Sequence, residues 1–223
     1  MERAVDFHVQ VLFTNGRLLK IWKPMGRKQT IDRAEILRAV ETVVARDGAA
    51  GLTIGAVAAE MGISKAGVLY DFGSKEGLIL AYTESRIDGW REEVRDREIA
   101  RAGEANPRLN SILDKYQACA GADDSQIALA ISAAMVASHG CRNIVRSAHE
   151  DDIQTIISEA VQDAGDPAPA LIAYLALWGL KSLEFQGVSG CDPALRDRVV
   201  TLLRSLPSLS IPSLLPSANT GTE

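Results

Sequence analysis

Three neighbouring residues, Lys65, Ala66 and Gly67, have the chemistry of a surface that can contact DNA. Lysine supplies a positive charge and hydrogen-bond donors for phosphate oxygens and base edges. The small residues beside it let the backbone come close to a groove, and glycine offers only that close approach because it has no side chain. We predict seven DNA-contacting residues: Thr53, Ser64, Lys65, Ala66, Gly67, Tyr70 and Lys75. For Tyr70 the alternative stays open that its ring packs inside the fold.

Two short helices joined by a tight turn are predicted to present these residues. Thr53 can cap the first helix by accepting a backbone N–H bond, and an apolar stripe follows it at helical spacing. Gly62 supplies the turn, where a residue with positive φ costs little, and Ser64 can cap the second helix. The side chains expected to face inward from the second helix are Val68, Leu69 and Phe72. The first turn of that helix is then left facing solvent.

Residues 62–79 resemble the recognition-helix signature of the tetracycline-repressor family of bacterial transcription regulators. Their sequence is GISKAGVLYDFGSKEGLI, and it is most similar to the branch that carries a Lys-Gly-Gly-Leu-Leu-Tyr-His-Phe run. Ala66 stands in place of a usual glycine and Asp71 in place of a usual histidine. An acid near a phosphate-facing position should repel DNA, so Asp71 is expected to weaken binding. The specific resemblance runs from about Ile31 to Tyr82.

The resemblance implies an all-α protein in which an N-terminal three-helix DNA-binding domain with a helix-turn-helix precedes a helical-bundle domain for ligand binding and dimerisation. It also implies three partners: double-stranded operator DNA, a small-molecule effector and a second copy of the chain as a homodimer. We therefore predict a ligand-responsive transcription regulator, a repressor released from its operator by a small hydrophobic ligand. The alternative is a helical enzyme or a nonregulatory small-molecule-binding module.

The composition is that of an ordinary globular protein. Of the 223 residues 24% are charged and 47% are hydrophobic, and the net charge of −5 argues against a nonspecific nucleic-acid coat. Three cysteines make no disulfide framework and suit a reducing cytosol. The longest apolar run, residues 171–180, is too short to span a bilayer. We expect a cytoplasmic protein with no membrane partner.

The sequence contains few of the residue patterns that are typical of catalytic or metal-binding sites. The sequence has no Gly-rich phosphate loop, nucleophile elbow, paired-histidine zinc motif or C-x-x-C pair. His139, Cys141 and His149 match no common metal-ligand spacing. The Asp151-Asp152 pair is interpreted as a helix start and not as an acid/base pair. We therefore expect no enzyme activity, no cofactor and no metal.

Four segments are predicted along the chain. Residues 1–24 are expected to be disordered or a non-native N-terminal extension, with a turn at Asn15-Gly16. They share no helical period with the residues from Ile31 onward, and Met25 looks like the natural start. The alternative is a genuine N-terminal extension. Residues 25–73 form the DNA-binding domain, whose first helix should end at Gly48. Residues 74–206 form the ligand-binding and dimerisation domain, and residues 207–223 a disordered tail.

The second domain is predicted to be helical throughout. A helix is expected to start at Ser74 and to break near 103–107, and others at 107–120, 125–138 and 151–164. Two further helices begin where an aspartate precedes proline, and they cover 168–187 and 194–206. The first of these two is apolar nearly all round, so both its sides should be buried. We predict a dimer interface from Leu171, Leu175, Trp178, Leu195, Val199, Leu202 and Leu206.

A largely apolar ligand pocket is predicted inside this domain. Its expected lining residues are Tyr116, Cys119, Ile131, Met135, His139 and Trp178. The alternative for each of them is closed core, and Trp178 is shared between the pocket and interface hypotheses.

Overall fold

The computed structural model describes most of the chain. The described residues are 7–14, 17–24, 32–118, 130–131, 133–134, 138–163, 165–186, 188 and 192–208. The predicted helix at 125–138, the residues Cys119 and Met135, the turn at Asn15-Gly16 and most of the predicted tail therefore lie outside them. Among the described residues no helix is both long and apolar enough to cross a membrane.

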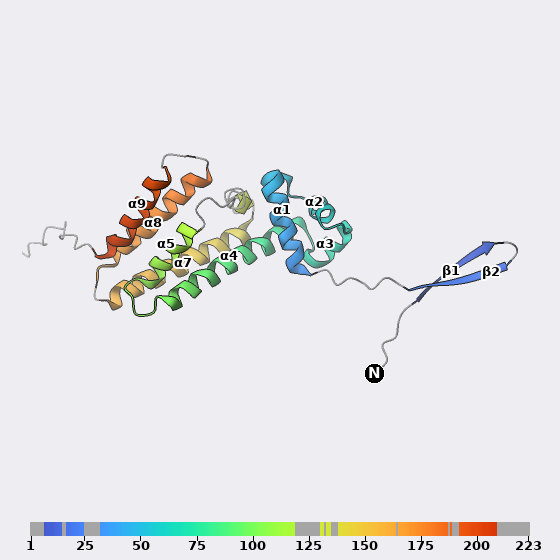
Figure 1. Ribbon diagram of the computed structural model, residues 1–223, viewed down its shortest axis with the longest axis horizontal. Coiled ribbons are helices and arrows are strands. Elements are labelled where there is room, and N and C mark those ends of the chain that lie inside the picture. The colour runs from blue at the N-terminus through green and yellow to red at the C-terminus, as the bar shows by residue number, and fades with distance from the viewer. Residues whose placement is uncertain are drawn as a thin grey trace, which may run out of the picture.

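Two antiparallel strands lie near the N-terminus. β1 (Phe7–Thr14) pairs with β2 (Arg17–Pro24), and the register sets Thr14 opposite Arg17 (Figure 1). The strands lie within residues 1–24, for which disorder or a non-native extension was predicted, and that interpretation stays a prediction. That Met25 is the natural start stays a prediction.

Helix α1 (Arg33–Gly51) is the first helix of the predicted DNA-binding unit. It begins at the cap Asp32, whose carboxylate accepts a hydrogen bond from the Ala34 amide at 3.0 Å. Gly48 has a φ of 69°, so the helix is broken there. The sequence analysis predicted that the helix ends at Gly48. The regular helix does break there, but helical residues continue to Gly51.

Two short helices follow, α2 (Ile54–Glu60) and α3 (Lys65–Phe72). Gly62 in the turn between them has a φ of 65°, as the sequence predicts. Their inward side chains join those of α1 in one core. The buried members from α2 and α3 are Val57, Ala58, Val68 and Phe72.

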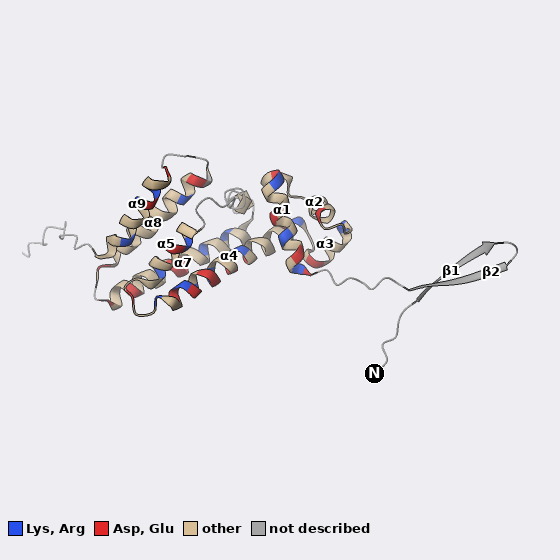
Figure 2. Cartoon of the chain, in the orientation of Figure 1, with Lys and Arg blue, Asp and Glu red and all other residues tan. Residues whose placement is uncertain are grey.

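Helix α4 (Lys75–Ala100) belongs to both cores of the molecule. Leu78, Ala81 and Tyr82 near its start pack in the core of the DNA-binding unit. Val94, four turns later, packs in the core of the C-terminal unit. Charges of both signs line its second half (Figure 2).

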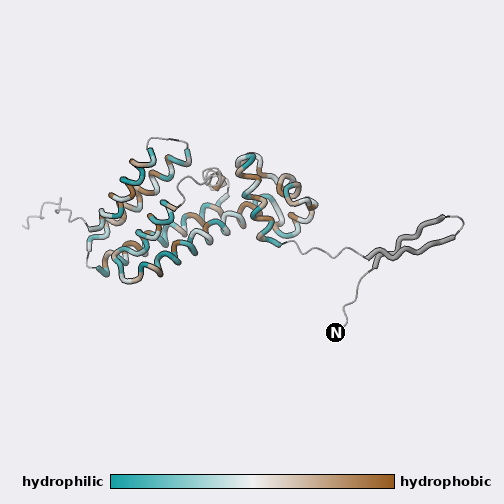
Figure 3. The backbone as a smooth tube through the Cα atoms, in the orientation of Figure 1, coloured by the Kyte–Doolittle hydropathy of each residue, from teal (hydrophilic) through white to brown (hydrophobic). Residues whose placement is uncertain are grey.

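The C-terminal unit is a bundle of α4 with four further described helices: α5 (Pro107–Ala118), α7 (His139–Gln162), α8 (Pro167–Phe185) and α9 (Pro193–Ser205), followed by a 3-10 turn, Leu206–Ser208. Hydrophobic stretches recur in both units, in α1–α3 and again across α8 (Figure 3). Asp166 and Asp192 cap α8 and α9 as predicted. The predicted helix start at Asp151 was wrong, because α7 runs unbroken from His139 and Asp152 pairs with Arg108 of α5 instead of capping a helix.

Candidate nucleic-acid interface

Three hydroxyl caps in succession build the predicted reading surface. The side-chain oxygens of Thr53, Ser64 and Ser74 accept hydrogen bonds from backbone amides at 3.0, 3.1 and 3.0 Å, and so begin α2, α3 and α4. Lys65 and Lys75 each follow a capping serine directly. Helix N-termini carry partial positive charge, so each lysine adds a full charge where the backbone already favours phosphate.

Six of the seven predicted contact residues are exposed, and Gly67 is half-buried. Tyr70 is 82% exposed, which rules out the alternative that its ring packs inside the fold. The surface is therefore open at Lys65, Ala66 and Tyr70 on one helix.

Leu69 was predicted to face inward, and this was wrong. Its side chain is 41% exposed, whereas Val68 and Phe72 are buried. In a helix of two turns Val68 and Phe72, four residues apart, already fill the inward face, and Leu69 lies one residue round on the side of Lys65. An exposed apolar side chain on a reading helix can contact the methyl group of thymine. The spacing of four residues from Lys65 was the signal that could have revealed it.

Gly55 is a second residue that the sequence analysis missed. An ideal Cβ on Gly55 would lie 2.9 Å from Cε of Lys65 and 3.3 Å from its Nζ. The ammonium group of Lys65 therefore reaches across to the first turn of α2. Glycine at this position leaves the space that the lysine stem occupies.

The start of α7 packs against the first turns of α4. Ser138 donates a hydrogen bond to the Glu76 carboxylate at 3.2 Å, and the buried thiol of Cys141 lies 3.6 Å from the Thr83 hydroxyl oxygen. An ideal Cβ on Gly140 would lie 2.8 Å from Cδ1 of Leu80, so glycine permits this close packing. The C-terminal unit thereby holds the helix that starts directly after α3.

The predicted ligand-binding residues that the structure describes do not line one pocket. Tyr116 is closed core: its hydroxyl donates to Glu184 at 2.7 Å and accepts from Arg196 at 2.8 Å, and burial raises its pKa to about 12. His139 is exposed in the first turn of α7. Ile131 lines a cavity beside the DNA-binding unit. Tyr116 and His139 therefore do not line a pocket in the single chain. Glu184 and Arg196 fix the position of Tyr116, and Glu76 holds the start of α7, and all three are distant in the sequence.

Trp178 lies in an aromatic cluster of the C-terminal unit. Its ring stands edge-on to His149 with centroids 4.5 Å apart, and 6.0 Å from the Trp90 centroid. Nζ of Lys181 lies 4.1 Å from the centroid of Trp90 and 4.9 Å from that of Trp178. His149 is 2.7 Å from the Tyr174 hydroxyl. Burial lowers the pKa of His149, which favours the neutral ring.

Arg108 contacts four carboxylates next to this cluster, and one of them, Asp152, accepts a hydrogen bond from Tyr174. Arg108 pairs with Glu98 at 2.8 Å, Asp151 at 3.3 Å and Asp152 at 3.0 Å, and its backbone amide donates to Glu159. Burial raises the pKa of Asp152, and it raises that of Glu159 to about 7 with help from the nearby charge of Glu98. Glu159 of α7 thus caps the N-terminus of α5. Among the described residues no group of three suitable side chains could hold a metal ion.

The predicted dimer residues divide into two groups. Leu175, Leu195 and Leu202 are exposed by 56%, 40% and 63%. The others are partly buried against the core of the C-terminal unit: Leu171, Trp178, Val199 and Leu206. Two exposed apolar residues of α8, Ile172 and Leu183, continue the line of Leu175 at helical spacing. In the single chain α8 is therefore buried on one side and not on both.

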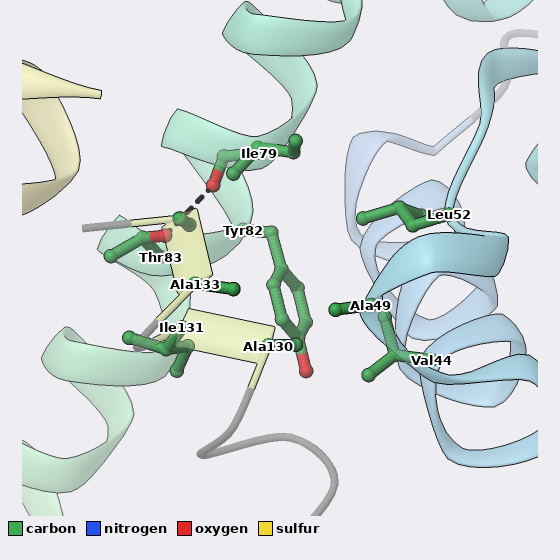
Figure 4. Close-up of a pocket in the computed structure, with 10 residues that line it drawn as sticks. Val44, Ala49, Leu52, Ile79, Tyr82, Thr83, Ala130, Ile131 and Ala133 are labelled. Atoms are coloured by element: carbon green, nitrogen blue, oxygen red, sulfur yellow. Dashed lines mark hydrogen bonds between the residues drawn. The ribbon is translucent and has the colours of Figure 1, made fainter. Parts of the chain in front are cut away.

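A cavity of about 170 Å³ lies where the two units meet (Figure 4). Its walls come from α1, the residue after it, the start of α4 and the segment 130–134. The lining residues are Val44, Ala49, Leu52, Ile79, Tyr82, Thr83, Ala130, Ile131, Ala133 and Ala134. Of the predicted ligand residues that the structure describes, Ile131 alone is among them.

Comparison with known proteins points to one group. Residues 36–82 match the model of bacterial regulatory proteins of the tetR family. No curated protein matches the chain.

Solved structures share the fold over most of its length. A TetR transcription regulator from Haloarcula marismortui is 18% identical with a TM-score of 0.66, over 79% of this chain and 96% of the other. A protein described as a transcriptional regulator from Saccharomonospora viridis, in complex with choline, is 23% identical with a TM-score of 0.61, over 78% and 93%. The multidrug binding protein EbrR, complexed with malachite green, is 18% identical with a TM-score of 0.60, over 79% and 98%. Identities this low establish the fold alone.

Proposed function

Because this chain belongs to the tetR family of bacterial regulatory proteins through residues 36–82, we propose that it is a homodimeric repressor released from its operator by a small hydrophobic molecule. As a family member the chain is a DNA-binding transcription regulator and not an enzyme. The repressor role, the dimer, the ligand response and a cytoplasmic location are parts of the proposal.

The observation that carries the proposal is the exposed first turn of α3. Lys65 and Ala66 are open to solvent behind the Ser64 cap, and Tyr70 projects one turn later. A helix presented in this way fits the major groove, with Lys65 at base edges and the capped amides of α2 and α4 at phosphates. We add Leu69 to the proposed contact residues, because it shares the exposed face.

The dimer part rests on the exposed apolar face of α8 and α9. Two reading helices must lie about 34 Å apart to enter successive major grooves, so a two-fold dimer is required. Leu175 and Leu202 are exposed apolar residues on neighbouring helices that already pack together. A second copy of the same two helices would cover them.

The ligand part is supported by the connection through α4. This helix begins immediately after α3 and packs in both cores, so a ligand that moves it would move the reading helix. Two proteins of the same fold hold choline and malachite green, which supports a small organic effector for this chain too.

An electrophoretic shift with the DNA that flanks the gene of this chain tests the proposal. Lys65→Ala should weaken binding by about 1–3 kcal/mol, and affinity should fall steeply with salt because phosphate contacts release counterions. The control is Arg146→Ala, an exposed residue of α7. Equal affinities for both variants would remove Lys65 from the reading surface, and no shift with wild-type protein would favour a nonregulatory binding module.

The same experiment extends to the dimer. Leu175→Asp combined with Leu202→Asp should give monomers by light scattering and weak operator binding, since two charges would face the partner. A folded double variant that remains a dimer would place the interface elsewhere.

A further inference from the structure

We propose that the cavity between the DNA-binding unit and α4 binds a compact apolar molecule the size of one aromatic ring, and that its occupancy changes operator affinity. The coupling to DNA rests on the proposed function. The site differs from the pocket predicted within the C-terminal bundle, because it lies beside the reading unit itself.

Small side chains create the space. Four of the ten lining residues are alanines, and their side chains end at Cβ: Ala49, Ala130, Ala133 and Ala134. The volume of about 170 Å³ is close to the roughly 150 Å³ of an engineered apolar cavity that stays dry and takes up benzene. A single ring therefore fits in this half-open cavity.

The lining selects an uncharged and apolar occupant. No lysine, arginine, aspartate, glutamate or histidine is among the described residues that line the cavity. The hydroxyl of Thr83 already donates to the Ile79 carbonyl at 2.9 Å, and so it is committed within α4. A charged ligand would lose its favourable hydration without gaining an oppositely charged partner. An apolar ring has no such polar hydration to lose.

The walls belong to parts that act in DNA binding. The ring of Tyr82 stands between Ala49 on the α1 side and Ala133 on the other (Figure 4). Val44 and Leu52 of the opposite wall are buried in the core that supports α2 and α3. An occupant thus contacts α4 and the DNA-binding unit at once.

Contact with both parts makes the site sensitive to their relative position. The α1 wall spans the break at Gly48, since Val44 lies before it and Ala49 and Leu52 lie after it. A ligand that fits one position of α1 against α4 better than another shifts the population toward that position. Operator DNA selects one position as well, so the two affinities are linked and the linkage is reciprocal.

Benzene is the probe that tests the site, with methyl-labelled protein observed by NMR. We expect saturable shifts of the methyl groups of Ala130, Ile131 and Ala134 in the wild-type chain. Ala49→Leu replaces a methyl with an isobutyl side chain in the cavity and should weaken benzene binding by more than about tenfold. Ala45→Leu makes the same change on an exposed position of α1 and should leave the shifts intact. Benzamidinium, a ring of similar size with a charge, should leave the cavity methyls unshifted.

Operator affinity is then measured with and without saturating benzene. A change of about fivefold or more in the wild type and in Ala45→Leu, absent in Ala49→Leu, supports the proposal. Absence of cavity shifts, equal binding of benzamidinium, or shifts without any change in operator affinity would overturn it. Failure of the proposed function is separate, since the protein without benzene would then not bind the operator at all.

Discussion

The DNA-binding unit and the C-terminal bundle are held together in different ways. In the first, each helix start is fixed within three residues by its own cap, as Thr53, Ser64 and Ser74 show. In the second, one side chain ties together residues 43 to 44 positions away, as Arg108 does with Asp151 and Asp152. Local bonds can be recognised in a sequence and distant ones cannot. Four sets of substitutions test this contrast.

Loss of Arg108 should have the largest effect. Its side chain is only 16% exposed and pairs with Glu98 and Asp152, so Arg108→Ala leaves carboxylates buried without their partner. We expect a loss of about 3–5 kcal/mol in the free energy of unfolding, measured by urea denaturation. Arg146→Ala is the control, because Arg146 is 65% exposed and its pair with Glu150 should contribute under about 1 kcal/mol. Similar losses in both variants would show that the Arg108 network does not hold the bundle.

Two glycines of α4 should respond to alanine with opposite signs. A Cβ on Gly77 would lie within 2.2 Å of the Phe72 carbonyl oxygen, so Gly77→Ala must push α3 away from α4. It should cost about 1–3 kcal/mol and weaken operator binding as well. Gly89 has open space around its Cβ position, and Gly89→Ala should stabilise the helix by about 0.5–1 kcal/mol. Thermal melts of both variants decide, and a stabilised Gly77→Ala would contradict the close packing.

Adjacent residues of α3 should separate stability from DNA binding. Leu69 is exposed, and Leu69→Ala should leave the free energy of unfolding within about 0.5 kcal/mol while weakening operator binding by about 1 kcal/mol. Val68 is fully buried, and Val68→Ala should mainly destabilise the fold. Chemical denaturation and the electrophoretic shift are measured on both. If Leu69→Ala binds like wild type, Leu69 does not take part in reading.

The smallest effect is a pH dependence at Glu159. Its pKa is raised from the usual 4.5 to about 7, so the folded chain holds this proton more tightly than the unfolded chain does. Its contribution to stability is fully present below about pH 4.5, declines as the pH rises to about 7, and is lost above that. Glu159→Gln should remove this decline and stabilise the protein at pH 8 by less than about 1 kcal/mol, because the carboxylate is partly solvated.

The measurement is unfolding by urea at pH 5 and pH 8. Glu150→Gln changes an exposed carboxylate on the same helix and serves as the control. An unchanged difference between the two pH values in Glu159→Gln would contradict the assignment.

Local chemistry explains which features could be predicted from the sequence. The caps at Thr53 and Ser64, the turn at Gly62 and the proline-led starts of α8 and α9 each depend on residues within one turn. The all-α architecture follows from such signals and from apolar periodicity.

Features that depend on distant partners could not be read in this way. Asp151-Asp152 resembles a helix start until Arg108 is known to lie beside it. Tyr116 resembles a pocket residue until Glu184 and Arg196 close over its hydroxyl. The junction cavity was missed because its small residues carry no chemical signal in a sequence, and only the packing of three segments makes them a wall.

The length of α4 converts small rotations into distances that matter on DNA. Its 26 residues span about 39 Å at 1.5 Å per residue. If the far end stays fixed in the bundle, a tilt of about 5° moves the near end by roughly 3.4 Å, which is the spacing of one base pair. A small displacement of α4 close to its fixed end would therefore move α3 by about the spacing of one base pair. The reading helix would then no longer be aligned with its half-site on the DNA. A molecule bound in the bundle near this pivot would therefore need to move α4 only slightly, whereas an occupant beside Tyr82, close to the near end, would act on the reading unit without this amplification.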